Sequence, residues 1–581
     1  MSSIPAPSRP ADRPLSLDET LRLIAPAEGP HDPLPEHVDV LVVGGGPVGL
    51  TAANLLGSFG VGCLVVETKA VTSDMPKAIA IDDEYMRTLD GVGLTQALRP
   101  HLSRPFGVHF LSPFGFVLVK VPGFVTPNGF GNRNAVLQPV FEKVLLDGCR
   151  RFQSVRCHFG ASLTQIKQDG ERATATIETA SGPCRLAARY VLACDGSRSF
   201  IRSALNIPFP GTRIDEPHLV VDLADFPDQV DHSRFFCNPR RPVNSVPAPY
   251  GGRRLEFMLF PDDDPARIVT DDGVRDLVDR HTPYRGVPLH IIRRAIYGFS
   301  ERIADRLQDG RIFLLGDAAH VMPPFGGQGM NTGARDAANL CWKLAAVLRS
   351  QLCAIVLASY ETERRDHIRE IVDYSVRVGR LANIRSRPLA VMRDAAFALA
   401  NIFPSVRRYF REMRHLPRPA FKQGLLVRDG EADDGLTGRI LPRLLLVRSD
   451  GVSCSVDDFA GTGFALIGLG VGRDAFERTV RHPVWKRLDP RLITVNVDHA
   501  GKEDDFRPAD DRGRALLARH QGRILVLRPD RYVAGSATPE RFEALSDQLQ
   551  DLLMPPVPGS ARVSASPFLG AGEPLAHIGR P

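Results

Sequence analysis

Four short apolar runs occur in the first part of the chain, at residues 38–43, 63–66, 190–194 and 312–315. Continuous apolar runs of this length are typical of strands buried on both faces of a parallel sheet. Each run leads directly into a glycine or an acidic residue, namely Gly44, Glu67, Asp195 and Gly316. Ligands of open parallel sheets lie at the carboxyl ends of the strands, so one long ligand touching several strand ends would explain the pattern.

The first two runs belong to a strand–turn–helix–strand unit of the length of a βαβ mononucleotide-binding motif. Gly44, Gly46 and Gly49 match GxGxxG, and a helix is predicted over residues 50–59. These glycines permit, in turn, a tight turn, close approach of a pyrophosphate, and packing of the helix on the strand. Glu67, 18 residues after Gly49, is placed to accept a hydrogen bond from a ribose hydroxyl. A glycine-rich turn without a ligand is the alternative, but the complete unit favours dinucleotide binding.

The two ends of the chain lack periodic apolar patterns. Residues 1–36 contain eight prolines and are expected to form a disordered leader, with one short helical turn near residues 17–23. Residues 556–581 are rich in Pro, Gly and Ser and are expected to form a disordered tail.

Between these ends the pattern predicts three domains. Residues 208–299 are rich in alternating strands and predict a β-sheet substrate domain. This domain is inserted into a nucleotide-binding domain formed by residues 37–207 and 300–415. Residues 430–555 alternate apolar strands with helical segments, which is typical of a small α/β domain.

Composition limits the function classes. The chain has 581 residues, 24% of them charged and 43% hydrophobic, as in ordinary globular proteins of several domains. An excess of six basic residues over this length does not favour nucleic acid as a partner. No apolar run is long enough for a membrane span, and prolines interrupt the N-terminus where a signal peptide would be apolar. The nine cysteines form no CxxC, so we expect reduced thiols in a cytoplasmic protein, without a metal site.

Three motifs resemble those of the FAD-dependent aromatic hydroxylases, single-component flavoprotein monooxygenases with the p-hydroxybenzoate hydroxylase fold. They are GGGPVGL, CDGSRSFIR and GDAAHVMPPFGGQGMN. Within that family, the chain from residue 38 to 533 is similar to the 3-(3-hydroxyphenyl)propionate (3-hydroxycinnamic acid) hydroxylases. The segments that carry this similarity are IDDEYMRTL, FFCNPRRP, RRLEFM, ERRDHIREIVDYSVRVGR, VRRYFREMR and RPDRYVA.

The resemblance implies the fold class. It is α/β, with a Rossmann-like FAD-binding domain, an inserted β-sheet substrate domain and a C-terminal thioredoxin-like domain. Because the C-terminal domain has only the isolated Cys454, we expect a structural or dimer-supporting role for it, not a redox role.

The resemblance also assigns cofactor contacts. The glycine turn and Glu67 would hold the ADP half of FAD, and Gln138 would contact the flavin side. Asp195 would line the groove shared with the nicotinamide cofactor, and Asp317 would bind the ribityl chain, since a carboxylate accepts two hydroxyl hydrogen bonds. Residues 323–329 would run under the isoalloxazine and lead into a helix N-terminus that stabilises reduced flavin. The implied cofactor-binding set is Gly44, Gly46, Pro47, Val48, Gly49, Glu67, Lys77, Gln138, Asp195, Asp317, Pro324, Gly327, Gly329, Met330 and Asn331.

The chain departs from the family pattern at two places. Lys77 stands where related sequences usually carry Arg, and Lys cannot make a bidentate phosphate contact, so FAD affinity or ring mobility is expected to differ. The loop PPFGGQGMN matches the broad family better than the tryptophan-containing version of the propionate hydroxylases. This second departure leaves the substrate open.

Several candidate residues also have structural explanations. Asp195 and Asp317 could be helix N-caps, although the motif context favours ligand binding. His320 could be a catalytic base, but a structural role is preferred. Arg240 and Arg241 are equally explained as a substrate-carboxylate site or as a solvated surface pair, and Tyr250 and Arg254 are weaker substrate candidates. No catalytic side chain is assigned, because the flavin would carry the chemistry.

A single GxGxxG fits an enzyme in which the nicotinamide binds transiently. The resemblance implies that NADH (with NADPH as the alternative) reduces FAD after a small phenol binds. Reduced flavin and O2 then hydroxylate the ring ortho to its hydroxyl. We expect conversion of 3-(3-hydroxyphenyl)propionate to 3-(2,3-dihydroxyphenyl)propionate in aromatic catabolism. The oligomeric state is left open, with a homodimer as the one candidate. Another phenol (resorcinol, a chlorophenol or a polyketide ring), a flavin oxidoreductase that does not insert oxygen, and a flavoprotein sensor without turnover are the alternatives.

Overall fold

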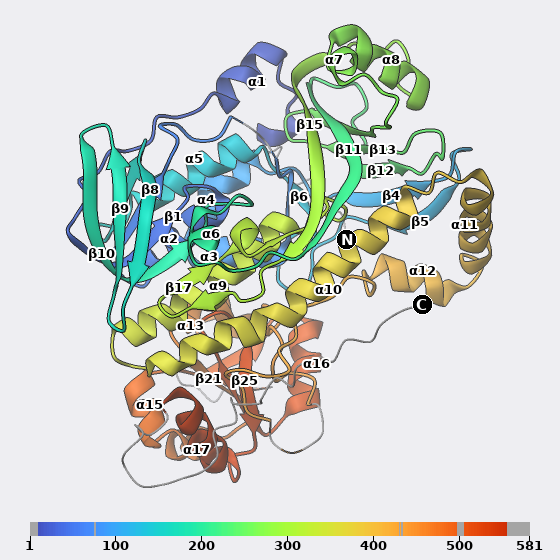
Figure 1. Ribbon diagram of the computed structural model, residues 1–581. Helices are drawn as coiled ribbons and strands as arrows, with labels where there is room; N and C mark the ends of the chain where they lie inside the picture. The colour runs from blue at the N-terminus through green and yellow to red at the C-terminus, as the bar shows by residue number, and fades with distance from the viewer. Residues whose placement is uncertain (1–9, 75–76, 429, 431–433, 497–504, 555–581) are drawn as a thin grey trace, which may run out of the picture.

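Three large β-sheets organise the chain in the computed structural model, which describes residues 10–74, 77–428, 430, 434–496 and 505–554 (Figure 1). The first sheet lies with the N-terminal helices, the second forms the upper right of the molecule, and the third lies in the C-terminal part at the bottom (Figure 1). A two-stranded ribbon of β3 (Ala80–Ile81) and β6 (Asn134–Ala135) completes the sheets.

The first sheet has the order β16-β17-β10-β1-β2-β7, extended from β10 by the antiparallel strands β9 and β8. All four predicted apolar runs lie in it as neighbouring parallel strands, which confirms this part of the prediction. Their carboxyl ends therefore meet at one edge of the sheet. The strands are β1 (His37–Val43), β2 (Cys63–Glu67), β7 (Val155–Phe159), β8 (Ser162–Gln168), β9 (Ala173–Thr179), β10 (Gly182–Ala193), β16 (Gln308–Asp309) and β17 (Ile312–Leu314).

Helices cover this sheet, and α2, α5 and α9 among them consist mostly of buried residues. Helix α2 begins with Pro47, a residue that suits the first helical position because its missing N–H would have no partner there. It packs against α5 and α9, and α10 packs on α9. The helices of this part are α2 (Pro47–Ser58), α3 (Asp83–Gly91), α4 (Thr95–Leu98), α5 (Gln138–Cys149), α6 (Phe200–Ala204), α9 (Gly329–Leu348) and α10 (Ser359–Ala382).

The second sheet has the order β18-β15-β11-β14-β13-β12-β4-β5. It takes β4 and β5 from the chain before residue 208, and β4 pairs in parallel with β12. Helices α7 (Pro265–Ile268) and α8 (Asp271–His281) contribute buried side chains to the same apolar cluster as Leu219, Val221 and Leu223 on one face of the sheet. The strands are β4 (Gly107–Leu111), β5 (Val117–Val121), β11 (Gly211–Ala224), β12 (His232–Phe236), β13 (Val243–Pro247), β14 (Arg253–Met258), β15 (His290–Ile303) and β18 (His320–Val321).

Since side chains alternate along a strand, the opposite face of the second sheet carries His218, Val220 and Asp222 of β11. In the neighbouring strand β14, Met258, Glu256 and Arg254 stand directly opposite these three residues. This face lies against the first sheet's loops, because His218 contacts Phe325 of the predicted flavin loop.

The C-terminal domain has the predicted thioredoxin-like topology. Strands β21 and β22 are parallel, while β24 and then β25 follow on the other side of β21 as antiparallel neighbours. Its strands are β19 (Leu445–Arg448), β20 (Ser453–Ser455), β21 (Ala465–Leu469), β22 (Arg491–Val495), β23 (Asp505–Pro508), β24 (Arg523–Leu527) and β25 (Val533–Ala537). Its helices are α13 (Val456–Ala460), α14 (Arg473–Thr479), α15 (Pro483–Leu488), α16 (Asp511–His520) and α17 (Phe542–Leu553).

Residues 10–36 differ from the predicted disordered leader, although the short helical turn predicted near residues 17–23 is confirmed by the helix found there. A 3-10 turn, η1 (Pro10–Asp12), and helix α1 (Leu17–Ile24) occur there, and Ser16 and Glu19 form a capping box at the start of α1. Leu15 N–H donates to the Tyr250 carbonyl at 3.0 Å, so the leader's backbone finds partners far along the chain. Local composition does not encode such long-range pairs. Residues 1–9 and the predicted tail 556–581 lie outside the described residues.

A buried ionic cluster fastens the C-terminal domain to α9 and α10. The Glu363 carboxylate accepts hydrogen bonds from Arg528 (2.8 Å), Lys343 (2.8 Å) and Asn339 (2.6 Å). The side chains of Glu363, Lys343 and Arg528 are 0%, 0% and 1% exposed. The attraction of Arg528 and Lys343 outweighs burial and holds the pKa of Glu363 below its usual value. Each charge in the cluster thus depends on the others for compensation.

We expect Arg528→Met to destabilise the protein by about 3–5 kcal/mol, because it leaves the buried Glu363 carboxylate short of positive charge. The matched control is Arg514→Met, which removes an exposed pair with Asp511 and should change stability by less than about 1 kcal/mol. Urea unfolding followed by tryptophan fluorescence measures the difference. An Arg528→Met protein as stable as the control would show that the cluster does not hold the two parts together.

Candidate cofactor and substrate site

Two of the three fingerprint glycines are required by the protein's own packing. Gly44 has φ +110°, and a Cβ there would lie 2.2 Å from the Cys194 carbonyl oxygen. A Cβ on Gly49 would lie 2.0 Å from the Gly44 carbonyl oxygen. Gly46 differs, because a Cβ on it would meet no atom within 4 Å. The fold itself does not require glycine at 46, and the open space there fits the close approach of a pyrophosphate.

The N-terminus of α2 offers free backbone donors beside this space. Gly46 is the N-cap and supplies no side-chain hydrogen bond, and Pro47 occupies the first turn. The remaining N–H groups of that turn and the helix dipole favour an anion. Val48 packs against Gly316, just after β17, so closely that a Cβ on Gly316 would lie 3.0 Å from Val48 Cγ2. This contact holds the start of α2 beside the end of that strand.

Glu67 lies at the end of β2, next to the glycine turn. Its Oε2 accepts a hydrogen bond from Gly45 N–H at 2.7 Å and its Oε1 from Lys69 N–H at 3.0 Å. A carboxylate has about four acceptor positions, so each oxygen retains capacity for a ribose hydroxyl. Glu67 can therefore hold the turn and a ligand at once.

Asp195 presents an unsatisfied oxygen. Its Oδ2 accepts from Ile201 N–H at 3.1 Å, whereas Oδ1 is buried without a hydrogen-bond partner among the described residues. Burial raises the pKa of Asp195, and hydrogen bonds from Ser199 and Ile201 oppose the rise. The N-cap of α6 is Ser199, so capping does not by itself explain Asp195. A donor group from a ligand would satisfy Oδ1.

Asp317 lies in the turn η3 (Gly316–Ala318) after the fourth strand of the parallel group. Its side chain is exposed between two buried neighbours, and the N-cap of the turn is Leu315, not Asp317. Loss of hydration among the surrounding protein atoms raises the pKa of Asp317, while electrostatic attraction to His320 and Lys77 lowers it. An accessible carboxylate in this position fits the hydroxyl groups of a ribityl chain.

A buried carboxylate beneath this turn, missed in the sequence analysis, fixes its shape. Asp336 Oδ2 accepts from Gly316 N–H at 3.0 Å and from His320 Nε2 at 2.7 Å, and its Oδ1 accepts from Arg364 Nε at 2.8 Å. Burial would raise the pKa of Asp336, but His320 and Arg364 hold it below its usual value. His320 is thus engaged inside the protein, in line with the structural role preferred for it. The available signal was an acid that, apart from Arg335, is flanked by the small apolar residues Ala334, Ala337 and Ala338.

The backbone at residues 77–78 is held from two sides. Gln138 Oε1 accepts from Ala78 N–H at 2.7 Å, and the Gln138 amide also donates to Glu142. From the second sheet, Arg254 donates to the Lys77 carbonyl at 2.9 Å while it pairs with Asp222. Gln138 and Arg254 therefore position the segment that presents the exposed Lys77 side chain.

The glycine-rich loop before α9 is tied down by Asn331. Asn331 Nδ2 donates to the carbonyls of Gly327 (2.7 Å) and Ala80 (3.2 Å), and its Oδ1 accepts from Asp82 N–H. Gly327 has φ +67°, which favours glycine. A Cβ on Gly329 would meet no atom within 4 Å, and no side chain caps the N-terminus of α9. Pro324 and Met330 are half-buried in the same loop. This helix N-terminus can therefore receive an anionic group.

The side of the loop facing the second sheet is aromatic. The His218 ring lies 5.1 Å from that of Phe299 and 5.8 Å from that of Phe325. Burial lowers the pKa of His218 to about 4, so the ring is neutral at pH 7. Such surroundings fit an uncharged ring of a substrate.

Three of the four substrate candidates from the sequence already have other partners in the structure. Arg241 pairs with Asp263 at 2.7 Å, and Arg240 is exposed. Tyr250 contacts His101 at 2.5 Å, beside the leader. Arg254 is buried against Asp222, as described above. The structure does not bring these side chains together into one carboxylate site.

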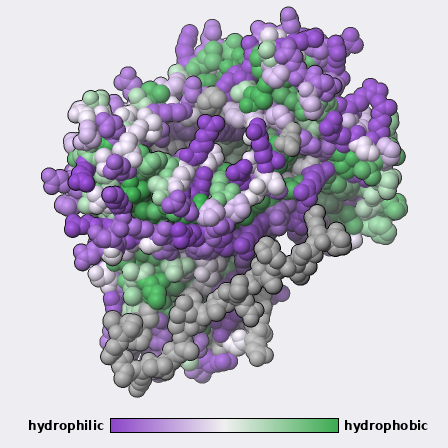
Figure 2. All heavy atoms as spheres, in the orientation of Figure 1, coloured by the Kyte–Doolittle hydropathy of each residue, from purple (hydrophilic) through white to green (hydrophobic). Residues whose placement is uncertain are grey.

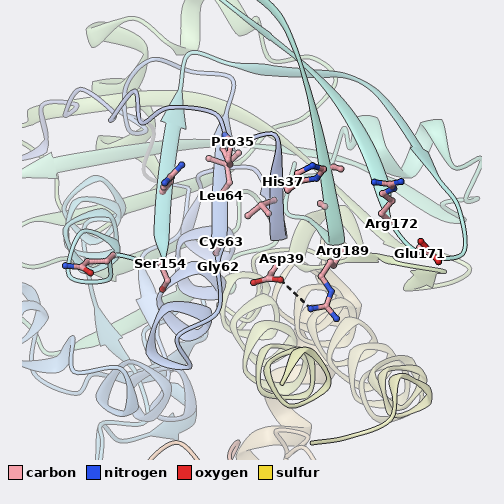
Figure 3. A pocket seen from close by; sticks show the side chains of 15 residues that line it. Pro35, His37, Asp39, Gly62, Cys63, Leu64, Ser154, Glu171, Arg172 and Arg189 are labelled. Carbon is pink, nitrogen blue, oxygen red and sulfur yellow. Dashed lines mark ion pairs between the residues drawn. The ribbon is translucent and has the colours of Figure 1, made fainter. Parts of the chain in front are cut away.

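An open cavity lies elsewhere, at the opposite edge of the first sheet. It has a volume of about 620 Å³ and is lined at its centre by the amino ends of β1, β2 and β7, with the Asp39–Arg189 ion pair across it (Figure 3). This is the edge of the first sheet opposite Glu67 and Asp195, so it is not the predicted cofactor site. Among the described residues, no cluster of His, Cys, Asp and Glu could hold a metal ion.

Comparisons with known proteins identify relatives over most of the chain. A family model described as FAD binding domain matches residues 37–375, and one described as HcaD C-terminal domain matches residues 438–552. A 3-(3-hydroxy-phenyl)propionate/3-hydroxycinnamic acid hydroxylase of Escherichia coli O81 (strain ED1a) is 35% identical over 525 residues, covering 89% of this chain and 95% of the relative.

Solved structures share the fold. The flavin-dependent monooxygenase PieE, in complex with FAD and substrate, has a TM-score of 0.76 at 22% identity, over 91% of this chain and 100% of that one. The anhydrotetracycline hydroxylase OxyS from Streptomyces rimosus has a TM-score of 0.69 at 25% identity, over 90% and 99% of the two chains.

Substitution of Gly46 tests whether the open space is a phosphate site. Gly46 has φ −79°, which alanine adopts freely, so Gly46→Ala should fold normally. Its methyl group would crowd a pyrophosphate at a cost of roughly 1–3 kcal/mol, which lowers FAD affinity about five- to 150-fold. Titration of the apoprotein with FAD measures the loss.

The matched control is Gly44→Ala, which should lower the thermal stability of the apoprotein itself, because its Cβ meets the Cys194 carbonyl. If Gly46→Ala binds FAD as tightly as the wild type, the pyrophosphate does not lie at this turn.

Proposed function

The chain belongs to the family of FAD-binding aromatic hydroxylases, and from this premise we propose that it hydroxylates a phenolic acid ortho to its ring hydroxyl. The proposed substrate is 3-(3-hydroxyphenyl)propionate, the product is 3-(2,3-dihydroxyphenyl)propionate, and NADH is the reductant. The proposal includes a role in the catabolism of aromatic compounds in the cytoplasm.

One observation carries the cofactor part of the proposal: the donor and acceptor set at the carboxyl edge of the first sheet fits FAD. Open space at Gly46, the unpaired Oδ1 of Asp195 and the accessible carboxylate of Asp317 lie at successive strand ends. The space at Gly46 fits a pyrophosphate, Asp195 fits a hydrogen-bond donor of the ligand, and Asp317 fits a polyol chain. A short mononucleotide would not need all three ends.

In this proposal the chain's own residues bind and orient. Glu67 accepts from the ribose, the first turn of α2 receives the pyrophosphate, and Asp317 accepts from the ribityl hydroxyls. The N-terminus of α9 stabilises negative charge at the ring. FAD, when bound, supplies hydride acceptance and oxygen activation. The aromatic side chains near Phe325 exclude water from the reacting ring.

Asp336 acts as a positioning residue in this proposal. By accepting from Gly316 N–H it fixes the turn from which Asp317 projects. Because Asp336 is 0% exposed and compensated by His320 and Arg364, it keeps its charge over the working pH range.

The choice of substrate rests on similarity to the propionate hydroxylases over 89% of the chain. Two candidate partners of the substrate carboxylate, Arg241 and Arg254, are already paired with Asp263 and Asp222. A polyketide ring is the second candidate, because OxyS, an anhydrotetracycline hydroxylase, shares the fold at 25% identity. NADPH is the alternative reductant, and a homodimer is the proposed oligomer. We also propose an FAD-binding domain of residues 37–207 and 300–415, a β-sheet substrate domain of residues 208–299 and a C-terminal domain of residues 430–555.

The test is NADH oxidation by the purified flavoprotein with a panel of phenols, while hydrogen peroxide and catechol products are measured. We expect 3-(3-hydroxyphenyl)propionate to accelerate NADH oxidation at least tenfold and to yield one catechol for each NADH, with little peroxide.

Acceleration that yields only peroxide would make this compound an effector and another ring the substrate. If no phenol accelerates NADH oxidation, the hydroxylase proposal fails, whatever the FAD content of the protein.

A further inference from the structure

Helices α11 (Arg387–Ala400) and α12 (Pro404–Arg411) form an arm beside the second sheet that displays apolar side chains to solvent (Figure 1). Val391, Met392 and Leu399 of α11 are 64%, 65% and 63% exposed, and Ile402 and Phe403 in the following turn are 67% and 56% exposed. Scattered exposed apolar residues are ordinary, but a row of them on one helix and its turn marks an interaction surface.

The arm is firmly attached, so its exposed face is part of the fold. Arg393, 6% exposed, donates to the Cys237 carbonyl at 2.8 Å. Asn401 donates to the Leu118 carbonyl at 2.7 Å, which holds the α11–α12 turn beside β5. The turn that precedes β5 carries Phe114 and Phe116, which are 83% and 70% exposed. Apolar side chains thus extend from the arm towards the β4–β5 hairpin.

The arm is also strongly basic. Residues 385–414 contain seven arginines and two acidic residues. Both acids are already paired, Asp394 with Arg393 and Glu412 with Arg414. Within the described part of the chain, Arg387, Arg407, Arg408 and Arg411 are exposed and have no acidic partner. Figure 2 shows hydrophobic surface next to hydrophilic side chains on this side of the molecule.

From these observations we propose that the arm docks on an anionic phospholipid surface. Arginines next to exposed aliphatic and aromatic side chains are the combination that binds the headgroup region of anionic membranes. The arm lies on the surface and does not cross it. In the described part of the chain no single helix is long and apolar enough to span a membrane, and α11 and α12 reach that measure only as a pair bent by 105°.

The charge distinguishes this partner from the other occupants of an apolar face. In a twofold dimer the same patch meets itself, so two sets of unpaired arginines would share one interface and repel each other. A nucleic acid would satisfy the arginines but would leave Val391, Leu399 and Ile402 exposed to water. An anionic lipid surface satisfies both the charge and the apolar side chains.

The experiment is vesicle flotation of the full-length flavoprotein at about 0.1 M salt, where charges about 10 Å apart are largely screened. We expect binding to vesicles of phosphatidylcholine with phosphatidylglycerol, and little binding to phosphatidylcholine alone. Each arginine near the surface contributes roughly fivefold, so the triple variant R407Q/R408Q/R411Q should bind on the order of a hundredfold more weakly. The variant L399S/F403S, with unchanged charge, should also lose binding.

The matched control is R156Q/R172Q/R189Q, which should bind vesicles like the wild type. It removes the same number of exposed arginines from the cavity at the amino ends of β1, β2 and β7. Flavin absorbance confirms that each variant is folded. Equal losses in both triple variants would reduce the effect to net charge and overturn the proposal. The proposal is also overturned if the protein does not bind anionic vesicles. Light scattering of the L399S/F403S variant and an RNA-binding assay then show whether the arm is instead a dimer interface or an RNA-binding surface.

Discussion

Close approach of backbone segments at the ends of four parallel strands is the constraint on which the rest of the structure depends. Gly44 N–H donates to the Val66 carbonyl, Cys194 N–H to the Val43 carbonyl and Leu315 N–H to the Ala193 carbonyl, at 2.8–3.0 Å. A side chain at Gly44 would break this contact with Cys194. Because the ends are locked in register, the acidic residues that follow them stand along one edge, within reach of a single extended ligand.

Buried charge links this edge to the C-terminal domain. On α10, Arg364 bonds Asp336 beneath the Asp317 turn, and the adjacent Glu363 bonds Arg528 of the C-terminal domain. Buried ion pairs are weak sources of net stability, but they tolerate few alternative arrangements. The C-terminal domain is thereby connected, through buried charged side chains of α10, to the turn that carries Asp317.

The strands and the fingerprint could be predicted from the sequence because their causes are local. Continuous apolar runs, the GxGxxG spacing and Glu67 each depend on residues within one βαβ unit. The missed features depend on partners far apart in the chain. The leader is ordered by Tyr250, β4 joins β12 across more than a hundred residues, and Arg254 reaches the Lys77 carbonyl from the second sheet. Residue type suggested a substrate ligand at Arg254, whereas Asp222 already compensates its charge.

The central claim is that the chain inserts one atom of molecular oxygen into an aromatic ring. Incubation of the flavoprotein with NADH, 3-(3-hydroxyphenyl)propionate and ¹⁸O-labelled O2, followed by mass spectrometry of the catechol, tests it most directly. We predict one ¹⁸O atom in each product molecule, and none when the label is in water. A catechol whose new oxygen comes from water, or a whole panel of phenols that stay unoxidised while NADH is consumed, would contradict the account and leave a flavin oxidoreductase without oxygen insertion.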